Sequence, residues 1–327
     1  MNDQPTEMQC MEVWSGSQMA TDGVAFGGLD AWVYSKPYGG AKQGGDIYYA
    51  SSCATGRITR LLLADVSGHG QKVAATAADL RTLMRRFVNR LDQAEFVRLL
   101  NEQFGAVSAD GRFASAIVTT FFSPTARLTV CNAGHPRPLL YRASTREWSL
   151  LTHQGTVSSG PRNLPLGMLD VTAYEQFDVE LAPGDCLLAY TDALIEARDA
   201  DGEMLDEPRF LRIVRLLGDV EPEHLIQALL HEITDRYPQN LSDDDVTVML
   251  IRASGRPLRF SLAEKLRAAG RLARSLVLAV NPRAERPPLP DLVLANIGGA
   301  IIPQLERTWR VRKTPSQGLN RHTTQRE

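Results

Sequence analysis

The sequence predicts an α+β fold in which two β-sheets are covered by helices. Apolar segments of strand length dominate the chain, and the segments with helical spacing follow one another in pairs. Paired helices between runs of strands favour stacked sheets over the alternating units of a parallel α/β fold. The chain has 327 residues, of which 43% are hydrophobic and 23% are charged. These values are ordinary for a globular protein and allow a sizeable core.

The elements of the first half follow from turn signals and apolar spacing. Residues 1–27 are polar and predict a loose N-terminal lead-in. Beyond them, alternating apolar residues around Gly-rich turns predict strands, and apolar residues at helical spacing predict amphipathic helices. The expected elements are a strand from Asp30, a β-hairpin of segments 47–49 and 58–66, and helices at 71–90 and about 93–106.

The second half repeats this order of strands followed by paired helices. The expected strands are 113–122, 128–132, 139–141, 174–181, 186–190 and 246–251. The expected helices are 207–217 and 222–236. Strands therefore flank each helix pair, which is the pattern of sheets that carry helices on their outer faces.

The charge distribution sets the C-terminal part apart from the rest. Residues 253–327 contain 14 Lys and Arg against 5 Asp and Glu, whereas residues 1–252 contain 22 and 33. Such a change of sign indicates a change of role. We therefore divide the chain into the lead-in, a domain at 28–252 and a basic helical extension at 253–327 with a disordered end. An amphipathic helix is expected at 261–280 within this extension.

Three roles are open for the extension. In order of preference, they are packing on the acidic domain, binding of a partner or a second copy, and contact with an anionic membrane surface or nucleic acid. Because contact with nucleic acid belongs to the least favoured of these roles, we do not expect nucleic acid as a partner. No apolar run reaches the roughly 20 residues of a membrane span, and no secretory signal is visible. Four scattered cysteines form no CxxC pair, and we expect a cytoplasmic protein.

Acidic residues occur at the ends of several expected strands, next to small residues. They are Asp46 after two glycines, Asp65 at the end of 58–66, Asp192 after 186–190, and Asp243–Asp245 before the last strand. Carboxylates that converge repel one another, and a divalent cation removes this repulsion. Ligation by oxygen atoms suits Mg²⁺ or Mn²⁺. Each aspartate alone is more often a turn residue or helix cap than a ligand, and His69 and His135 alone are explained as residues of loops or turns.

Five short motifs occur in a fixed order along the chain. They are Gly44-Gly45-Asp46, Asp65-Val66-Ser67-Gly68-His69-Gly70, Asn132-Ala133-Gly134-His135-Pro136, Tyr190-Thr191-Asp192 and Asp244-Asp245-Val246-Thr247. Together they resemble the SpoIIE/RsbU-like branch of the metal-dependent protein serine/threonine phosphatases, the 2C type or PPM family. Two further segments fit the same branch, 164–167 and 181–185. The resemblance covers about residues 28–252.

The resemblance implies an αββα sandwich with a binuclear Mn²⁺ or Mg²⁺ site at one end. The expected catalytic and metal-binding residues are Asp46, Asp65, Asp192 and Asp244, with the backbone carbonyl of Val66 as a further ligand and Asp245 as the alternative to Asp244. Asp65 would bridge the two ions. The family has Gly after the aspartate of the fourth motif, whereas this chain has Ala193. The part that His69 takes in catalysis stays open.

The resemblance also implies a function. The expected substrate is phosphoserine or phosphothreonine on a regulatory protein, an anti-anti-sigma (STAS) factor of a partner-switching pathway. Two cations would activate a shared water and neutralise phosphate charge. The helices at 71–90 and about 93–106 either act as a switch that sets metal occupancy or simply cover the sheet, and a homodimer is one option for assembly. The alternative is a catalytically weak regulatory protein that uses the same fold to bind its partner.

Overall fold

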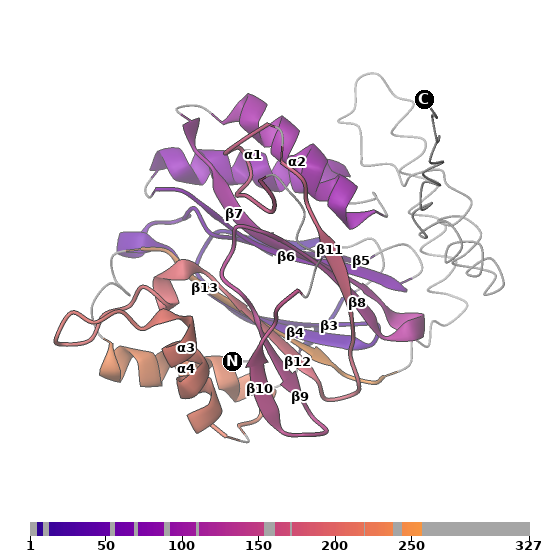
Figure 1. Cartoon of the computed structure of the whole chain (residues 1–327), viewed down its shortest axis with the longest axis vertical. Helices are drawn as coiled ribbons and strands as arrows, with labels where there is room; N and C mark the ends of the chain where they lie inside the picture. The colour runs from indigo at the N-terminus through magenta and orange to yellow at the C-terminus, as the bar shows by residue number, and fades with distance from the viewer. Residues whose placement is uncertain are drawn as a thin grey trace, which may run out of the picture. The chain divides into compact units, whose positions relative to one another are not determined.

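Two stacked β-sheets, each covered by a pair of helices, make up the described part of the protein (Figure 1). The computed structural model describes residues 5–8, 13–52, 56–68, 71–87, 92–108, 111–153, 161–170, 172–218, 220–237 and 244–256. The order of layers is helices, sheet, sheet, helices. The predicted α+β class and αββα sandwich are therefore confirmed.

The first sheet has seven strands in the order β1-β3-β4-β13-β12-β9-β10. Their bounds are Thr6–Glu7 (β1), Ala20–Phe26 (β3), Leu29–Lys36 (β4), Val246–Ala253 (β13), Cys186–Tyr190 (β12), Leu139–Arg142 (β9) and Glu147–Leu150 (β10). Neighbouring strands are antiparallel except for the short pair β1 and β3. Because β13 lies between β4 and β12, segments far apart in sequence meet in the middle of this sheet.

The second sheet has six antiparallel strands in the order β11-β8-β7-β6-β5-β2. Their bounds are Gln176–Glu180 (β11), Arg127–Ala133 (β8), Ala114–Phe122 (β7), Ile58–Val66 (β6), Ile47–Ser52 (β5) and Val13–Gly16 (β2). The predicted hairpin is confirmed as the pair β5 and β6. Its second strand is central and buried, which explains its nearly continuous apolar sequence.

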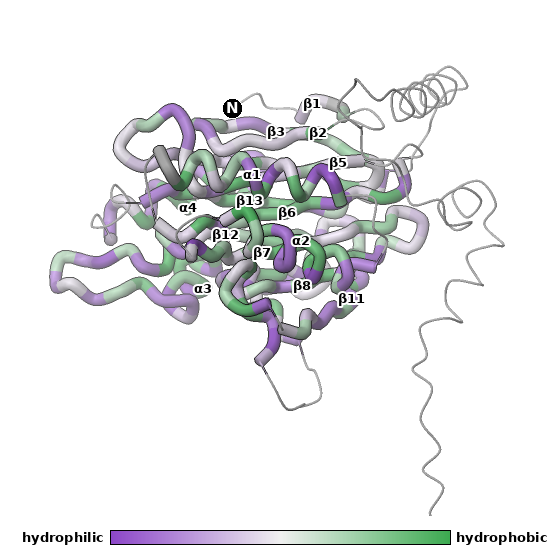
Figure 2. Tube along the Cα trace, turned by 90° about the horizontal axis from the view of Figure 1, so that it is seen from above, coloured by the Kyte–Doolittle hydropathy of each residue, from purple (hydrophilic) through white to green (hydrophobic). Residues whose placement is uncertain are grey.

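In the described ranges, four α-helices cover the outer faces of the two sheets. Helices α1 (Gln71–Phe87) and α2 (Gln93–Val107) pack on the second sheet, and α3 (Asp206–Leu216) and α4 (Pro222–Arg236) pack on the first. Figure 2 shows hydrophilic and hydrophobic residues alternating along α1 and α2, as amphipathic helices require. All four agree with the helices predicted from sequence to within a few residues.

Three apolar clusters hold the layers together. The cluster between the sheets includes Leu29, Leu61 and Ile117, each at most 2% exposed. The other two clusters lie between each sheet and its helices and contain Phe210 and Phe104, both fully buried. Burying apolar surface is the main favourable contribution to folding. Polar groups can gather at the ends of the strands, which lie outside these clusters.

The N-terminal segment differs from the predicted loose lead-in. Within residues 1–27, β2 pairs with β5 and β3 pairs with β4, so both sheets begin there. These strands are at or near the edges of their sheets. The exposed positions of β3 carry polar residues, so its sequence lacks the apolar pattern from which a strand is predicted. Strand β10 was also not predicted.

Several sequence predictions lie outside the described residues. They concern residues 88–90 of the first helix, His69, Asp243, the helix at 261–280 and the rest of the extension from residue 257. Among the residues that are described, no helix combines the length and the hydropathy needed to cross a bilayer.

Candidate metal centre

Strand pairing brings the acidic residues to one edge of the sandwich. Strands β5 and β6 are antiparallel, so Asp46, just before β5, lies close to Asp65 near the end of β6. Strands β12 and β13 are also antiparallel, so Asp192 after β12 and Asp244 before β13 lie next to each other at one end of two central strands of the other sheet. Because the two sheets stack face to face, the pair Asp46 and Asp65 and the pair Asp192 and Asp244 come together at the same end of the sandwich.

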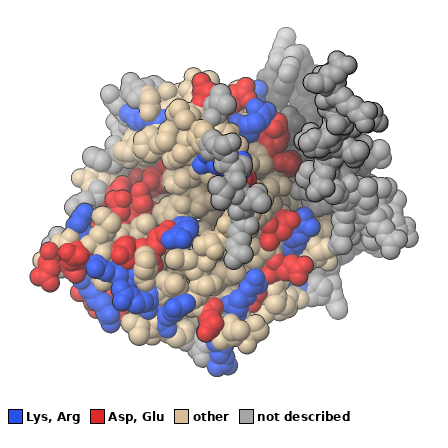
Figure 3. All heavy atoms as spheres, in the orientation of Figure 1, with Lys and Arg blue, Asp and Glu red and all other residues tan. Residues whose placement is uncertain are grey.

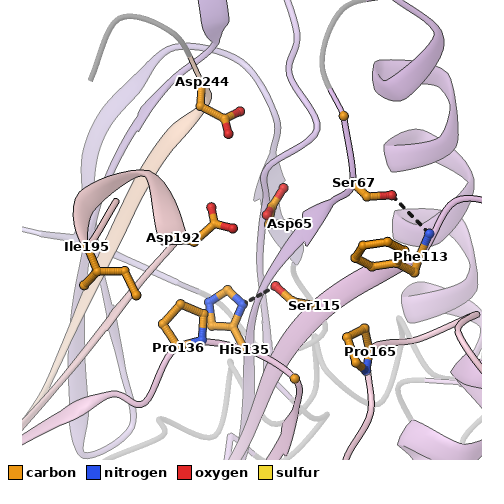
Figure 4. Close-up of a pocket in the computed structure, with 12 residues that line it drawn as sticks. Asp65, Ser67, Phe113, Ser115, His135, Pro136, Pro165, Asp192, Ile195 and Asp244 are labelled. Carbon is orange, nitrogen blue, oxygen red and sulfur yellow. Dashed lines mark hydrogen bonds between the residues drawn. The ribbon is translucent and has the colours of Figure 1, made fainter. Parts of the chain in front are cut away.

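A pocket of about 500 Å³ opens at this edge. Asp65, Asp192 and Asp244 line it, and Figure 4 shows their carboxylates turned toward one shared space. Phe113 and Pro165 lie on the opposite side of the same pocket. The pocket is therefore acidic on one side and apolar on the other.

Asp46 lies behind the pocket in the protein interior. Its side chain is 2% exposed, and its Oδ2 accepts a hydrogen bond of 2.9 Å from the hydroxyl of Thr191. The Thr191 oxygen accepts in turn from the backbone N–H of Thr247 at 3.0 Å. Asp46 Oδ1 is buried and has no hydrogen-bond partner within the described chain. A buried carboxylate oxygen without a partner is costly, which indicates that a ligand belongs beside it.

Burial and neighbouring negative charge raise the pKa of three of these acids, Asp46, Asp65 and Asp192. Burial, followed by the charge of Asp65, raises the pKa of Asp46 well above its ordinary value, while interactions with Thr247 and Thr191 act in the opposite direction. Burial, followed by the charges of Asp192, Asp244 and Asp245, raises the pKa of Asp65. Burial, followed by Glu196, also raises that of Asp192. The cluster therefore lacks positive charge.

Asp245 has a different environment from Asp244. Its side chain is 3% exposed, and its two carboxylate oxygens each accept a hydrogen bond of 2.6 Å, from the backbone N–H groups of Tyr38 and Gly45. Asp244, by contrast, lines the pocket and accepts from the N–H of Asp245 at 2.8 Å. The geometry therefore favours Asp244 as the ligand and gives Asp245 the task of holding the glycine turn.

The two glycines before Asp46 are required by close packing. A Cβ atom on Gly44 would collide with the carboxylate of Asp245. A Cβ atom on Gly45 would lie 2.9 Å from the carbonyl oxygen of Val66 and 2.6 Å from a methyl carbon of Val73. The turn therefore passes directly beside the backbone carbonyl that the resemblance assigns to the metal.

His135 is a pocket residue that the sequence suggested only as part of a turn. The turn exists, because the Asn132 side chain accepts from the His135 N–H and donates to its carbonyl, both at 2.8 Å. The His135 ring lines the pocket, and its Nδ1 is 2.7 Å from the hydroxyl of Ser115. Its Nε2 is buried and has no hydrogen-bond partner among the described residues. Burial lowers the pKa of His135 to about 3, so the ring is neutral.

Ala193, the departure from the family pattern, fits its position. It lies in a single 3₁₀ turn, Asp192–Leu194, and is 3% exposed. It is not among the described residues with positive φ. An alanine therefore causes no backbone strain here.

The residues present fit a divalent cation, although they do not enclose one. Their donors are oxygen atoms, one of them without a partner, and their charges repel. No three carboxylate, imidazole or thiol side chains in the described ranges converge tightly enough to form a ready cage. The acids therefore line an acidic pocket, and their assignment as ligands remains a proposal.

Comparison with known families agrees with this fold. Residues 55–254 match the sequence model of the family described as Stage II sporulation protein E (SpoIIE). The match spans more than half of the chain, and the protein belongs to this family. The predicted family is therefore confirmed. Asp46 lies just outside the matched range, whereas Asp65, Asp192 and Asp244 lie inside it.

Three solved structures illustrate the shared fold. The RsbU and RsbW domains of Rv1364c from Mycobacterium tuberculosis share 21% identity, with 88% of this chain and 79% of that chain covered and a TM-score of 0.60. The SiaA-PP2C domain of Pseudomonas aeruginosa shares 18% identity, with coverages of 68% and 85% and a TM-score of 0.57. RsbX in complex with magnesium shares 16% identity, with coverages of 71% and 99% and a TM-score of 0.51.

Proposed function

We propose that this protein is a metal-dependent phosphatase that hydrolyses phosphoserine or phosphothreonine on a regulatory protein. The observation that carries the proposal is the meeting of Asp65, Asp192 and Asp244 in one pocket, with Asp46 buried behind them. Membership of the SpoIIE family and the PP2C-type fold of its structural neighbours support it.

The metal-binding residues in this proposal are Asp46, Asp65, Asp192 and Asp244, with the carbonyl of Val66 as a further donor. Two bound Mn²⁺ or Mg²⁺ ions would supply a water of lowered pKa and would balance the charge of the phosphate. RsbX in complex with magnesium is a solved neighbour whose ion is of this kind. Asp245 then acts indirectly, by holding the turn from which Asp46 extends.

The side chains around the pocket orient one another. None of the described residues that line the pocket is Lys or Arg, so none of these twelve supplies a positive charge to a phosphate dianion. His135 is neutral and Ser115 fixes the orientation of its ring. The hydroxyl of Thr191 fixes Asp46. Phe113 and Pro165 give the side of the pocket opposite the acids an apolar surface.

The substrate in this proposal is a phosphorylated STAS (anti-anti-sigma) protein of a cytoplasmic partner-switching pathway. Two neighbours support it, the RsbU and RsbW domains and the SiaA-PP2C domain. The motifs that carry the family resemblance support it as well. The location of the protein in the cytoplasm and its assembly as a homodimer are part of the same proposal.

Substitution of Asp65 tests the proposal. We expect Asp65→Asn to lower Mn²⁺-dependent hydrolysis of an aryl phosphate by about 100-fold or more, because the variant loses a charged ligand while it keeps the side-chain size. The measurement is turnover with added Mn²⁺ and again after chelation. The matched control is Asp235→Asn, on an exposed position of α4 (side chain 62% exposed).

Two results would contradict the proposed function. Full activity of the Asp65 variant would show that the pocket is not the catalytic site. A folded wild-type protein that binds Mn²⁺ but hydrolyses no phosphoester would instead support the regulatory binding protein.

A further inference from the structure

Exposed apolar side chains gather beside the acidic pocket. Eight large hydrophobic side chains are exposed in the part of the chain that the structure describes. Four of them come from three neighbouring segments: Val107 (47% exposed), Phe113 (40%), Met168 (43%) and Leu169 (47%). We call these four residues the apolar rim. Apolar side chains that are exposed together mark a surface where another molecule binds.

Hydrogen bonds join the three segments of the apolar rim. Asn101 of α2 is 2% exposed, donates to the carbonyl of Leu169 at 3.0 Å and accepts from the N–H of Gly167 at 2.8 Å. Leu166 and Ala114 exchange two backbone hydrogen bonds of 2.7 and 2.9 Å. The end of α2, the start of β7 and residues 165–169 are therefore one fixed unit rather than three independent loops.

The apolar rim continues into the pocket. Phe113 belongs to both, and Pro165, next to Leu166, lines the pocket wall opposite the carboxylates (Figure 4). Figure 3 shows uncharged surface extending beside the hollow where acidic side chains gather. A polypeptide that places a phosphoserine among the acids would therefore lay its neighbouring residues on the apolar rim.

We propose that the apolar rim binds the phosphoprotein substrate, and that it selects phosphoserine sites flanked by apolar side chains. This inference rests on the proposed function. The chemistry of the partner follows from the apolar rim itself, which consists of one methionine, one leucine, one phenylalanine and one valine side chain. Apolar partners bury this surface favourably, and methionine adapts to side chains of different shape. Polar flanking residues would lose water without compensation.

The experiment compares two phosphoserine peptides and one aryl phosphate. One peptide carries Leu and Phe next to phosphoserine, and the other carries Ser and Gln at the same positions. We expect the wild-type kcat/KM to be about ten-fold higher for the apolar peptide. The double variant Met168→Ser, Leu169→Ser should lose this preference while its hydrolysis of the aryl phosphate stays unchanged, because neither residue lines the pocket.

The control is the double variant Met204→Ser, Leu216→Ser, which alters two exposed apolar residues outside the rim (37% and 71% exposed) and should keep the preference. Equal wild-type rates for the two peptides would overturn the inference while leaving the phosphatase activity intact. A changed oligomeric state of the rim variant with unchanged peptide preference would also overturn it, in favour of contact with a second copy. Absence of all phosphoester hydrolysis would remove both the proposed function and this inference.

Discussion

Two consecutive aspartates, Asp244 and Asp245, have different roles although they are only one position apart in the chain. Asp244 lines the acidic pocket, whereas Asp245 is buried and accepts hydrogen bonds from two backbone N–H groups. Those two groups belong to Tyr38 and Gly45, so the second aspartate joins the last strand to the turn before β5. The acidic pair in the sequence therefore combines a candidate ligand with a structural anchor.

The two roles predict opposite effects of substitution. We expect Asp245→Ala to lower the free energy of unfolding by about 3 kcal/mol, because two buried N–H groups lose a charged acceptor. Asp244→Ala should lower metal-dependent activity with little loss of stability, since it removes one of several repelling charges. Urea unfolding of both variants checks this difference. Equal destabilisation by the two substitutions would contradict the assignment.

The sequence could not separate these roles. It places both aspartates directly before the last strand, and either carboxylate could face the pocket. The distinction depends on Tyr38 and Gly45, which are about 200 residues away in the chain. His135 escaped prediction for the same reason, since its partner Ser115 lies on another strand. Residue types and spacing predicted which acids gather, but not what each contacts.

At the scale of elements, a buried glutamine fixes helix α2 on its sheet. Gln93 is 1% exposed, and its side-chain amide donates to the carbonyls of Val118 at 2.6 Å and Thr129 at 3.0 Å. Its side-chain oxygen accepts from the hydroxyl of Thr120. The side chain of Gln176, from β11, accepts from the N–H of Gln93 and caps the first turn of the helix. The polar network therefore sets the position of α2, and with it one side of the apolar rim.

Removal of this glutamine should loosen α2 without unfolding the sandwich. We expect Gln93→Ala to lower the free energy of unfolding by about 2–3 kcal/mol, because several buried polar groups lose their partner. Amide hydrogen exchange should increase in α1 and α2 more than in the opposite helices α3 and α4. A uniform increase over the whole chain would show that the network stabilises the fold generally rather than α2 in particular.

Elements with strong local signals were predictable from sequence. The amphipathic helices and the hairpin of β5 and β6 have periodic apolar residues and clear turn signals, and all were predicted. Strand β3 was missed because it contains Thr21, Asp22 and Gly23, and it is held mainly by its backbone pairing with β4. Such pairing depends on the partner strand and leaves little trace in the sequence itself.

At the scale of the whole molecule, the apolar clusters stabilise the sandwich, whereas carboxylates that lie close together repel one another at one end of it. Burial raises the pKa of Asp46 and Asp65, and neighbouring negative charges raise them further. A folded-state pKa above the unfolded value favours folding only while the group is protonated. This contribution is complete below the ordinary aspartate pKa of about 3.9 and is lost as pH rises through the raised folded-state pKa. Above the raised folded-state pKa values, the metal-free protein therefore retains the repulsion between the ionised carboxylates.

Divalent cations should consequently stabilise the folded protein as a whole. We expect saturating Mn²⁺ or Mg²⁺ to raise Tm at neutral pH by about 5–10 °C, because a ligand that binds only the folded state at 100 times its Kd adds about 2.7 kcal/mol. The shift should shrink at acid pH, where protons compete for the carboxylates. Asp65→Asn should melt higher than the wild type without metal and respond less to it, whereas Asp235→Asn should keep the wild-type response. A Tm that is indifferent to both cations, in wild type and variant alike, would mean that the acidic edge is not a metal centre.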